Sequence, residues 1–326
     1  MKKFYVKDLK EPGMRIRERF AIKFKKPPVE YKGKPGKWFE LRLTDRTGEI
    51  TAKYWGRDKE ETVKLYESLV KGDVVFVDGE LQEFPPESGQ ITISIDGSEG
   101  ELRRCLPGEY ELEDFVSTTE KDVHDMVSQI VSMLSEIENP YLKRLVERFT
   151  SDSGFMKLFM ESPAAMHYHQ NYVGGLVEHT LNVMKIASAI CDTHKELDRD
   201  LVLTGAFLHD IGKIKELETT ATAIDVSREG MLIGHTVLSY EMVLERIKDV
   251  EGFPEDLKLK VLHIILSHHG KLENGSPKEP QLPEAVAVYQ ADQCDAKVDI
   301  YLRLKREART EDPWIWDRKV GHVYLE

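Results

Sequence analysis

The 326-residue chain is longer than one hydrophobic core usually serves, so its length predicts two domains. It is 40% hydrophobic and 32% charged, which is typical of a soluble globular protein. The longest apolar run, residues 201–208, is too short to cross a bilayer, and no apolar stretch follows Lys2 and Lys3 as it would in a signal peptide. We therefore expect a protein that has no membrane segment and makes no membrane contact.

The net charge of −12 argues against a generally basic nucleic-acid binder. The charge is unevenly spread, however. Counted along the sequence, residues 1–46 hold fifteen Lys and Arg against six Asp and Glu, whereas residues 47–122 hold eight against nineteen. A local basic face can bind phosphates whatever the overall sign. On charge alone, a solvated strand face explains the basic segment equally well.

The three cysteines, Cys105, Cys191 and Cys294, are odd in number and form no CxxC pair. This spacing predicts neither a disulfide framework nor a thiolate zinc site. Such cysteine usage fits a reducing compartment, so we expect a cytoplasmic protein.

The first hundred residues have the pattern of short strands. Residues 39–43 and 50–55 alternate apolar and polar side chains, with Thr47-Gly48 as the turn between them. Further strands are expected at 74–77, 80–84 and 90–95, and a helix at 59–69. Five short strands with one helical stretch predict a five-stranded barrel of the OB-fold type over residues 1–100, which binds single strands in many proteins.

A linker and a helical domain follow. Residues 101–121 are rich in Gly, Glu, Ser and Thr, which favours a linker. From Asp122 onward apolar residues recur every three to four positions, as in amphipathic helices. The predicted fold class is therefore multidomain α+β: an N-terminal OB-fold β-barrel, then an all-α domain over residues 122–326.

Aromatic residues of the barrel are candidates for base stacking. The run 41–50, followed by Trp55 and by residues 72–75, resembles the strand pattern of nucleic-acid-binding OB domains. The candidates are Phe39, Tyr54, Trp55 and Phe84. Stacking on such rings contributes about 1–3 kcal/mol per base. The alternative is that alternating aromatics fill the barrel core.

Five segments of the helical half place a His or Asp beside an apolar helix face. They are His179, His209-Asp210 after the run 201–208, His235, His268-His269 after the run 261–266, and Asp292. A single buried histidine is usually a satisfied core residue. Burying five such segments costs several kcal/mol each unless the groups are paired or bound to metal. The set therefore predicts cations held by imidazole and carboxylate.

The ordered pattern H…HD…H…HH…D, with Ile-Gly-Lys213 after Asp210, resembles the HD superfamily of metal-dependent phosphohydrolases. The resemblance implies a first metal held by His179, His209, Asp210 and Asp292. It implies a second metal, bridged by Asp210, that is held by His235 and by one residue of the pair His268-His269, with His268 as the preferred ligand. Adjacent residues of a helix diverge by about 100°, so His269 is expected to contact phosphate or to protonate the leaving oxygen.

Asp210, Lys213 and His269 are thus the predicted catalytic residues. Lys213 lies about one helical turn after Asp210, where its ammonium is expected to neutralise charge on the phosphate. The alternative for Lys213 is a cation at a helix C-terminus that faces water.

Residues 172–180 and 265–271, followed by 275–277, resemble a narrower group, the HD 3′→5′ exoribonuclease family with an N-terminal OB-fold domain (YhaM-like). This resemblance implies release of nucleoside 5′-monophosphates from single-stranded RNA, and from DNA in some members, by water that two divalent ions activate. Manganese is the first choice of metal, with iron, nickel, cobalt or magnesium as alternatives. His167 and His169 are candidate substrate contacts, or else surface residues.

Two other functions fit the same residues. One is hydrolysis of nucleotides or cyclic nucleotides with a regulatory barrel, and the other is nucleic-acid binding without catalysis. The C-terminal Trp314 and Trp316 are expected to dock as a tail on the helical domain, and a homo-oligomer contact is the alternative.

Overall fold

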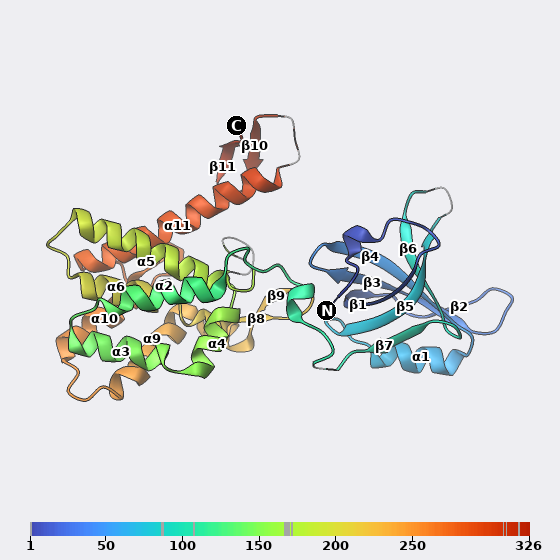
Figure 1. The fold of residues 1–326 in the computed structure, drawn as a ribbon, viewed down its shortest axis with the longest axis horizontal. Coiled ribbons are helices and arrows are strands. Elements are labelled where there is room, and N and C mark those ends of the chain that lie inside the picture. Colours follow the sequence, from blue (N-terminus) through green and yellow to red (C-terminus); the bar gives the residue numbers. More distant parts are fainter. Residues whose placement is uncertain are drawn as a thin grey trace. The chain divides into compact units, whose positions relative to one another are not determined.

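The computed structural model describes residues 2–85, 88–106, 108–165, 170, 172–308, 310, 312–318 and 320–326. The chain forms two compact units (Figure 1). The barrel unit comprises Met1–Ser117 with Thr219–Ala223, and the helical unit comprises Thr118–Glu218 with Ile224–Glu326.

A closed β-barrel forms the first unit. Its strands are β1 (Arg15–Lys25), β2 (Val29–Glu30), β3 (Lys37–Asp45), β4 (Gly48–Gly56), β5 (Val74–Glu83), β6 (Ile91–Asp96) and β7 (Glu101–Arg104). Five strands follow one another in the order β1-β3-β4-β6-β5, and β1 then pairs with β5 to close the ring. β4 and β6 run parallel, whereas the other pairs of the ring are antiparallel. The predicted OB-fold barrel is confirmed.

The helix between β4 and β5 begins where the sequence provides a cap. Helix α1 spans Lys59–Ser68, and the Asp58 carboxylate accepts hydrogen bonds from the backbone N–H groups of Glu60 and Glu61. These groups have no partner inside the helix, so an aspartate at this position stabilises the helix start by about 1 kcal/mol. Two short 3-10 helices, Val6–Asp8 and Leu112–Asp114, also belong to this unit.

Three details of the barrel differ from the sequence-based expectation. Strand β1 was not predicted from the sequence, because charged residues interrupt its alternation of apolar and polar side chains. The expected strands 74–77 and 80–84 are one strand, since Gly79 lies inside β5 and lets β6 approach closely: a Cβ there would lie 2.7 Å from the Ser94 carbonyl oxygen. The expected linker 101–121 begins too early, because residues Glu101–Arg104 pair with β5 as β7.

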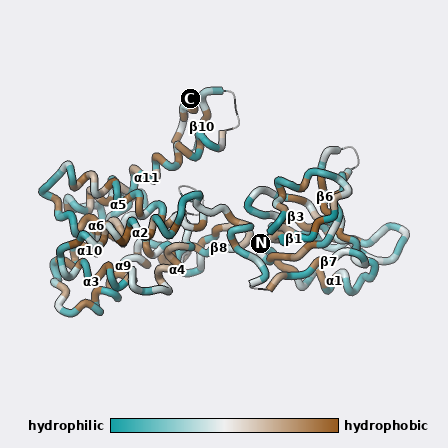
Figure 2. The backbone as a smooth tube through the Cα atoms, viewed as in Figure 1, coloured by the Kyte–Doolittle hydropathy of each residue, from teal (hydrophilic) through white to brown (hydrophobic). Residues whose placement is uncertain are grey.

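Helices make up most of the second unit. They are α2 (Val123–Ser135), α3 (Pro140–Thr150), α4 (Ser153–Glu161), α5 (Gly175–Thr193), α6 (Arg199–Leu208), α7 (Lys213–Glu216), α8 (Arg228–Ile233), α9 (His235–Lys248), α10 (Glu255–Ser267) and α11 (Pro283–Glu307), with a 3-10 turn at Leu272–Asn274. One apolar cluster joins side chains from α2, α3, α5, α6, α9, α10 and α11. Figure 2 shows the apolar run of α6 as a brown stretch of the tube. Every residue of α6 from Leu201 to Leu208 is buried, which explains its unbroken hydrophobic sequence.

Two short hairpins depart from the all-helical expectation. Strand β8 (Leu217–Thr219) pairs with β9 (Ile224–Val226), and β10 (Trp314–Asp317) pairs with β11 (Gly321–Tyr324). Strands of three or four residues carry too few alternations to be recognised in a sequence. Within the described part of the chain, no helix combines the length and the apolar character needed to cross a membrane.

Candidate metal centre and nucleic-acid interface

Five helices bring the predicted ligands together in the second unit. His179 lies in α5, His209 caps the C-terminus of α6, His235 begins α9, His268 caps the C-terminus of α10, and Asp292 lies in α11. His179, His209 and His268 are at most 1% exposed. Side chains separated by up to 113 positions in the sequence therefore meet inside one core.

Each histidine of this centre has its Nδ1 occupied by an acceptor. In His209 and His268, Nδ1 lies 2.8 and 2.6 Å from the backbone carbonyls of Ala206 and Ile265, three residues earlier. These carbonyls belong to the last turn of α6 and of α10, where backbone acceptors have no helical partner. The rings cap their own helices through Nδ1, and Nε2 keeps its lone pair for the centre.

The two carboxylate oxygens of Asp210 face different groups of ligands. Oδ2 lies 3.5 Å from Nε2 of His179 and 3.3 Å from Nε2 of His209. Oδ1 lies 3.5 Å from Nε2 of His235 and 3.4 Å from Nε2 of His268. Asp210 therefore stands between two sets of donors, as a bridging carboxylate does in a dinuclear site.

Two groups of four residues, sharing Asp210, are able to hold a metal ion. Among the described residues, the first group is His179, His209, Asp210 and Asp292, and the second is Asp210, His235, His268 and His269; the ligand atoms of each group lie within 4.8 Å of one another. All members of the first group are buried, whereas His235 and His269 of the second are partly exposed. The second group is therefore the side that substrate can reach from solvent.

The placement of His269 corrects the expectation that it diverges from His268. Helix α10 ends at Ser267, so the two histidines do not continue a helix, and their ring centroids lie 4.3 Å apart. Nε2 of His269 lies 3.0 Å from Nε2 of His235. The turn depends on Gly270, which has a φ of +77° and packs against the ring of Tyr289. His269 is thus a potential ligand as well as a potential substrate contact.

The electrostatics of the first group favour a bound positive charge. Burial opposes protonation of His179, but hydrogen bonds with Asp210, Asp292 and Asp295 outweigh it and hold the pKa of His179 well above its ordinary value. Burial raises the pKa of the Asp210 carboxyl, but Lys213, His209 and His179 outweigh it and bring the pKa well below its usual range. Without a cation, a proton has to balance these carboxylates.

In the second group, the surroundings of two histidines, His268 and His269, disfavour the protonated imidazole. Burial lowers the pKa of His268 and, together with the neighbouring His268, that of His269. A neutral imidazole is the form that binds metal. In addition, Oδ1 of Asp210 and Nε2 of His268 are buried without a hydrogen-bond partner, which is costly unless a ligand engages them. The residues therefore fit a pair of divalent cations.

Lys213 points into the centre. Its Nζ lies 2.6 Å from Oδ2 of Asp210, and its side chain is 8% exposed. The alternative for Lys213, a water-facing cation at a helix C-terminus, is therefore wrong. His167 and His169, the candidate substrate contacts, lie outside the described residues.

On the barrel, two of the four predicted stacking residues belong to the core. Phe39 is fully buried and stacks on Tyr54 with 5.1 Å between ring centroids, and Tyr54 packs against the same core. Phe39, Leu41 and Leu43 occupy every second position of β3 and share its inner face. The two-residue period of a strand therefore predicts that Phe39 is buried. Base stacking on Phe39 is excluded by its burial.

The outer face carries a different set of rings. Trp55 lies 5.4 Å from Trp38 and 6.2 Å from Tyr31, measured between ring centroids. Lys53 lies 3.3 Å from the ring centre of Phe84, which is 45% exposed, and 5.5 Å from that of Trp38. We call Tyr31, Trp38, Trp55 and Phe84 the aromatic face. The sequence analysis missed Trp38 and Tyr31. Trp38 directly precedes the inward-facing Phe39, so the alternation of a strand would have predicted that Trp38 faces outward.

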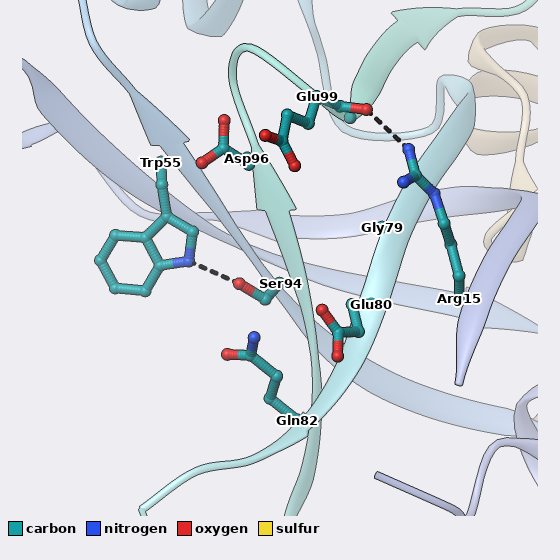
Figure 3. Close-up of a pocket in the computed structure, with 9 residues that line it drawn as sticks. Arg15, Trp55, Gly79, Glu80, Gln82, Ser94, Asp96 and Glu99 are labelled. Atoms are coloured by element: carbon teal, nitrogen blue, oxygen red, sulfur yellow. Dashed lines mark hydrogen bonds between the residues drawn. The ribbon is translucent and has the colours of Figure 1, made fainter. Parts of the chain in front are cut away.

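Two pockets adjoin Trp55. One pocket, of about 240 Å³, is also lined by Arg15, Glu80 and Asp96. Figure 3 shows Trp55 and Arg15 on opposite sides of this pocket, and the Trp55 indole N–H donates to the Ser94 hydroxyl over 2.9 Å. The other, of about 320 Å³, is lined by Tyr31, Lys34 and Arg57 among others. The pocket lined by Lys34 and Arg57 suits a phosphate backbone better than the pocket lined by Glu80 and Glu99 does.

Comparisons with known proteins agree with both units. An HD domain model matches residues 176–297, and a model described as OB-fold nucleic acid binding domain matches residues 22–99. The chain is 33% identical to the 3′-5′ exoribonuclease YhaM of Bacillus velezensis, over 89% of this chain and 87% of the relative. It is 34% identical to the protein of that name from Bacillus subtilis, over 90% and 88%. The chain belongs to the YhaM family. The family resemblance drawn from the sequence is confirmed.

The HD match of this YhaM-family chain contains every residue of the two ligand groups, from His179 to Asp292. The OB-fold match contains the whole aromatic face. Each unit therefore carries one candidate site: a metal centre in the helical unit and an aromatic surface with lysines on the barrel.

Proposed function

We propose that this protein is a metal-dependent 3′→5′ exonuclease that degrades single-stranded RNA, and single-stranded DNA as well, to nucleoside 5′-monophosphates in the cytoplasm. The observation that carries the proposal is the pair of ligand groups joined by Asp210. Relatives named 3′-5′ exoribonuclease align with about 90% of the chain and support the direction of cleavage and the RNA substrate. Cys105, Cys191 and Cys294 are free thiols, in keeping with a reducing compartment.

Two divalent cations, manganese in our proposal, supply a nucleophile from water and polarise the scissile phosphate when bound. The chain holds the donors in place before binding, because the rings of His209 and His268 are fixed by their own helix termini. Lys213 holds positive charge beside Asp210, close to where a phosphate has to lie. In this proposal His269, which is partly exposed, contacts that phosphate or gives a proton to the leaving oxygen.

The decisive experiment uses the full chain with 5′-labelled single-stranded RNA or DNA and Mn²⁺. We expect a ladder that shortens progressively from the 3′ end and accumulates nucleoside 5′-monophosphates. Hydrolysis of nucleotides or cyclic nucleotides beside intact oligonucleotides would replace the proposal with a nucleotide phosphohydrolase. Binding of RNA without turnover under any divalent metal would leave a nucleic-acid-binding protein.

The aromatic face is the proposed contact for single-stranded RNA. Replacing Trp55 with Ala should weaken RNA binding by about 1–3 kcal/mol, because a stacked base loses its platform. Fluorescence anisotropy with a labelled oligonucleotide measures this loss without turnover when divalent ions are absent. The matched control is Phe24→Ala, which removes an exposed barrel ring outside the aromatic face. Equal affinities of the Trp55 variant and the parent would remove the aromatic face from the proposal.

We further propose that the C-terminal hairpin joins two copies of the chain. Trp314 and Tyr324 are paired across β10 and β11, and Trp316 lies on the same face; all three are half-exposed or more. Val323, on the opposite face, is buried. Figure 1 shows this hairpin at the C-terminal end of α11. An isolated two-stranded hairpin is marginal in water, so an exposed aromatic face at this place favours a covered surface.

The exposed rings of the hairpin supply part of the area that a dimer interface needs. The three half-exposed rings offer roughly 300 Å², at about 150–250 Å² per aromatic side chain. Helix α11, which leads into the hairpin, has further exposed apolar side chains, namely Val298, Tyr301 and Leu302. A standard interface buries about 800 Å² per partner.

Light scattering coupled to size exclusion tests this contact. The parent chain should have the mass of a dimer or larger oligomer at micromolar concentration, and Trp314→Ser with Trp316→Ser should shift it to the mass of one chain. The exposed pair Leu232→Ser with Met231→Ser, in α8, is the matched control and should leave the mass unchanged. A monomeric parent chain would contradict the proposal, and a variant that loses RNA affinity at unchanged mass would assign the hairpin to RNA instead.

A further inference from the structure

Asp295 contacts the first ligand group without belonging to it. It lies in α11 one turn after Asp292 and is 8% exposed. Its Oδ2 lies 2.7 Å from Nδ1 of His179. That contact directs Nε2 of His179 toward the centre, where it lies 3.1 Å from Oδ1 of Asp292.

Two amides hold the Asp295 carboxylate in turn. Nδ2 of Asn182 donates to Oδ1 over 2.9 Å, and Nε2 of Gln170 donates to Oδ2 over 3.0 Å. Gln170 is buried and has a φ of +41°, a conformation that non-glycine residues adopt only where the surroundings impose it. Three N–H donors thus converge on one carboxylate, so its position is fixed independently of any ion.

Glu216 has the same relation to the second ligand group. Its carboxylate lies 2.9 Å from Nδ1 of His235 and accepts the backbone N–H of His235 over 3.0 Å. One side chain therefore caps the start of α9 and orients the imidazole that begins it. Nε2 of His235 then faces Oδ1 of Asp210.

We infer that Asp295 and Glu216 are positioning residues, one for each metal site, and that each sets the affinity of its own site. The inference rests on the proposed function. A carboxylate that accepts the Nδ1–H of a ligating imidazole fixes its tautomer and ring orientation and increases its donor strength. His209 and His268 rely on neutral carbonyls for this purpose, so only one histidine of each site is tied to a charged acceptor within the described residues.

The two sites should respond separately. Asp295→Asn leaves one acceptor oxygen for three donors, so we expect the affinity of one ion to fall by about 10–100-fold. Glu216→Gln keeps an acceptor for both donors but loses the charge, so we expect about a tenfold fall for the other ion. Asp295 acts on the buried group and Glu216 on the partly exposed group, and their effects should add in the double variant.

The experiment titrates the metal-free full chain with Mn²⁺ and measures free Mn²⁺ by electron paramagnetic resonance. Asp299→Asn is the matched control for Asp295, because Asp299 lies one turn further along α11 and accepts from the backbone N–H of Gln170 without touching a histidine of the described residues. Glu218→Gln, an exposed carboxylate of β8, is the control for Glu216. Thermal unfolding of each metal-free variant checks the fold.

Loss of one ion's affinity in each variant, with unchanged controls, supports the inference. Unchanged affinities, or equal losses in the controls, overturn it. If Asp295→Asn does not fold, Glu216→Gln still tests the second site on its own. If the variants lose ion affinity selectively but the parent chain leaves RNA intact, the proposed function alone is refuted. If the parent chain degrades RNA but the variants keep the parent's ion affinities, this inference alone is refuted.

Discussion

Asp210→Asn should lower the rate of RNA degradation by at least about 1,000-fold, the largest effect expected of any single substitution in this chain. The reason is that both oxygens of Asp210 are committed, one to each ligand group. An amide presents one acceptor oxygen and no charge, so both groups lose their shared donor. Single-turnover cleavage of labelled RNA with saturating Mn²⁺ measures the effect.

RNA binding should survive this substitution, because the aromatic face belongs to the other unit. Anisotropy without divalent ions should give the affinity of the parent chain. Asp192→Asn, an exposed aspartate near the end of α5, is the matched control and should keep the parent rate. An Asp210 variant with more than about a tenth of the parent activity would show that the metal ligands are assigned wrongly.

The buried ion pair between Lys2 and Asp45 gives the largest expected effect on stability. Nζ of Lys2 lies 2.8 Å from Oδ2 of Asp45, and the two side chains are 1% and 0% exposed. Burial lowers the pKa of Lys2 although hydrogen bonding to Asp45 opposes the shift. Asp45→Ala leaves this ammonium buried and unpaired, which should destabilise the barrel by about 3–5 kcal/mol.

Urea unfolding followed by circular dichroism and tryptophan fluorescence measures the loss. Asp45 also accepts hydrogen bonds from the backbone N–H groups of Val6 and Thr47, so adding Lys2→Met should restore part of the stability but not all. Glu49→Ala breaks an exposed ion pair with Lys23 in the same barrel and should cost at most about 1 kcal/mol. Equal losses for Asp45→Ala and Glu49→Ala would mean that burial of the pair has no energetic weight.

The ligand set was largely predictable because each ligand breaks a local rule. His209 and His268 each end a nearly unbroken apolar run, so the sequence alone predicts that these polar rings are buried. The orienting carboxylates Asp295 and Glu216 gave no such signal, since a carboxylate in an amphipathic helix normally faces water. The expectation that His269 diverges from His268 was wrong, because the end of α10 at Ser267 changes the direction of the next side chain and helix ends are poorly defined by sequence.

The aromatic residues of the barrel divide in the same way. The inward position of Phe39 follows from the period of two along β3, whereas the neighbourhood of Trp55 with Tyr31 requires the pairing of β2, β3 and β4. Strand pairing is set by contacts between distant segments, which no local pattern reports.

The sequence by itself determined the two-unit architecture, the barrel type and the five segments expected to hold metal, because periodicity and buried polar groups are local properties. The family resemblance then implied the six ligands within those segments. Only the tertiary structure decided which oxygen of Asp210 faces which ligand group, that His269 lies with the second group, and that Asp295 and Glu216 contact Nδ1 of His179 and His235. Convergence of this kind depends on how helices pack, and packing is fixed by many side chains at once.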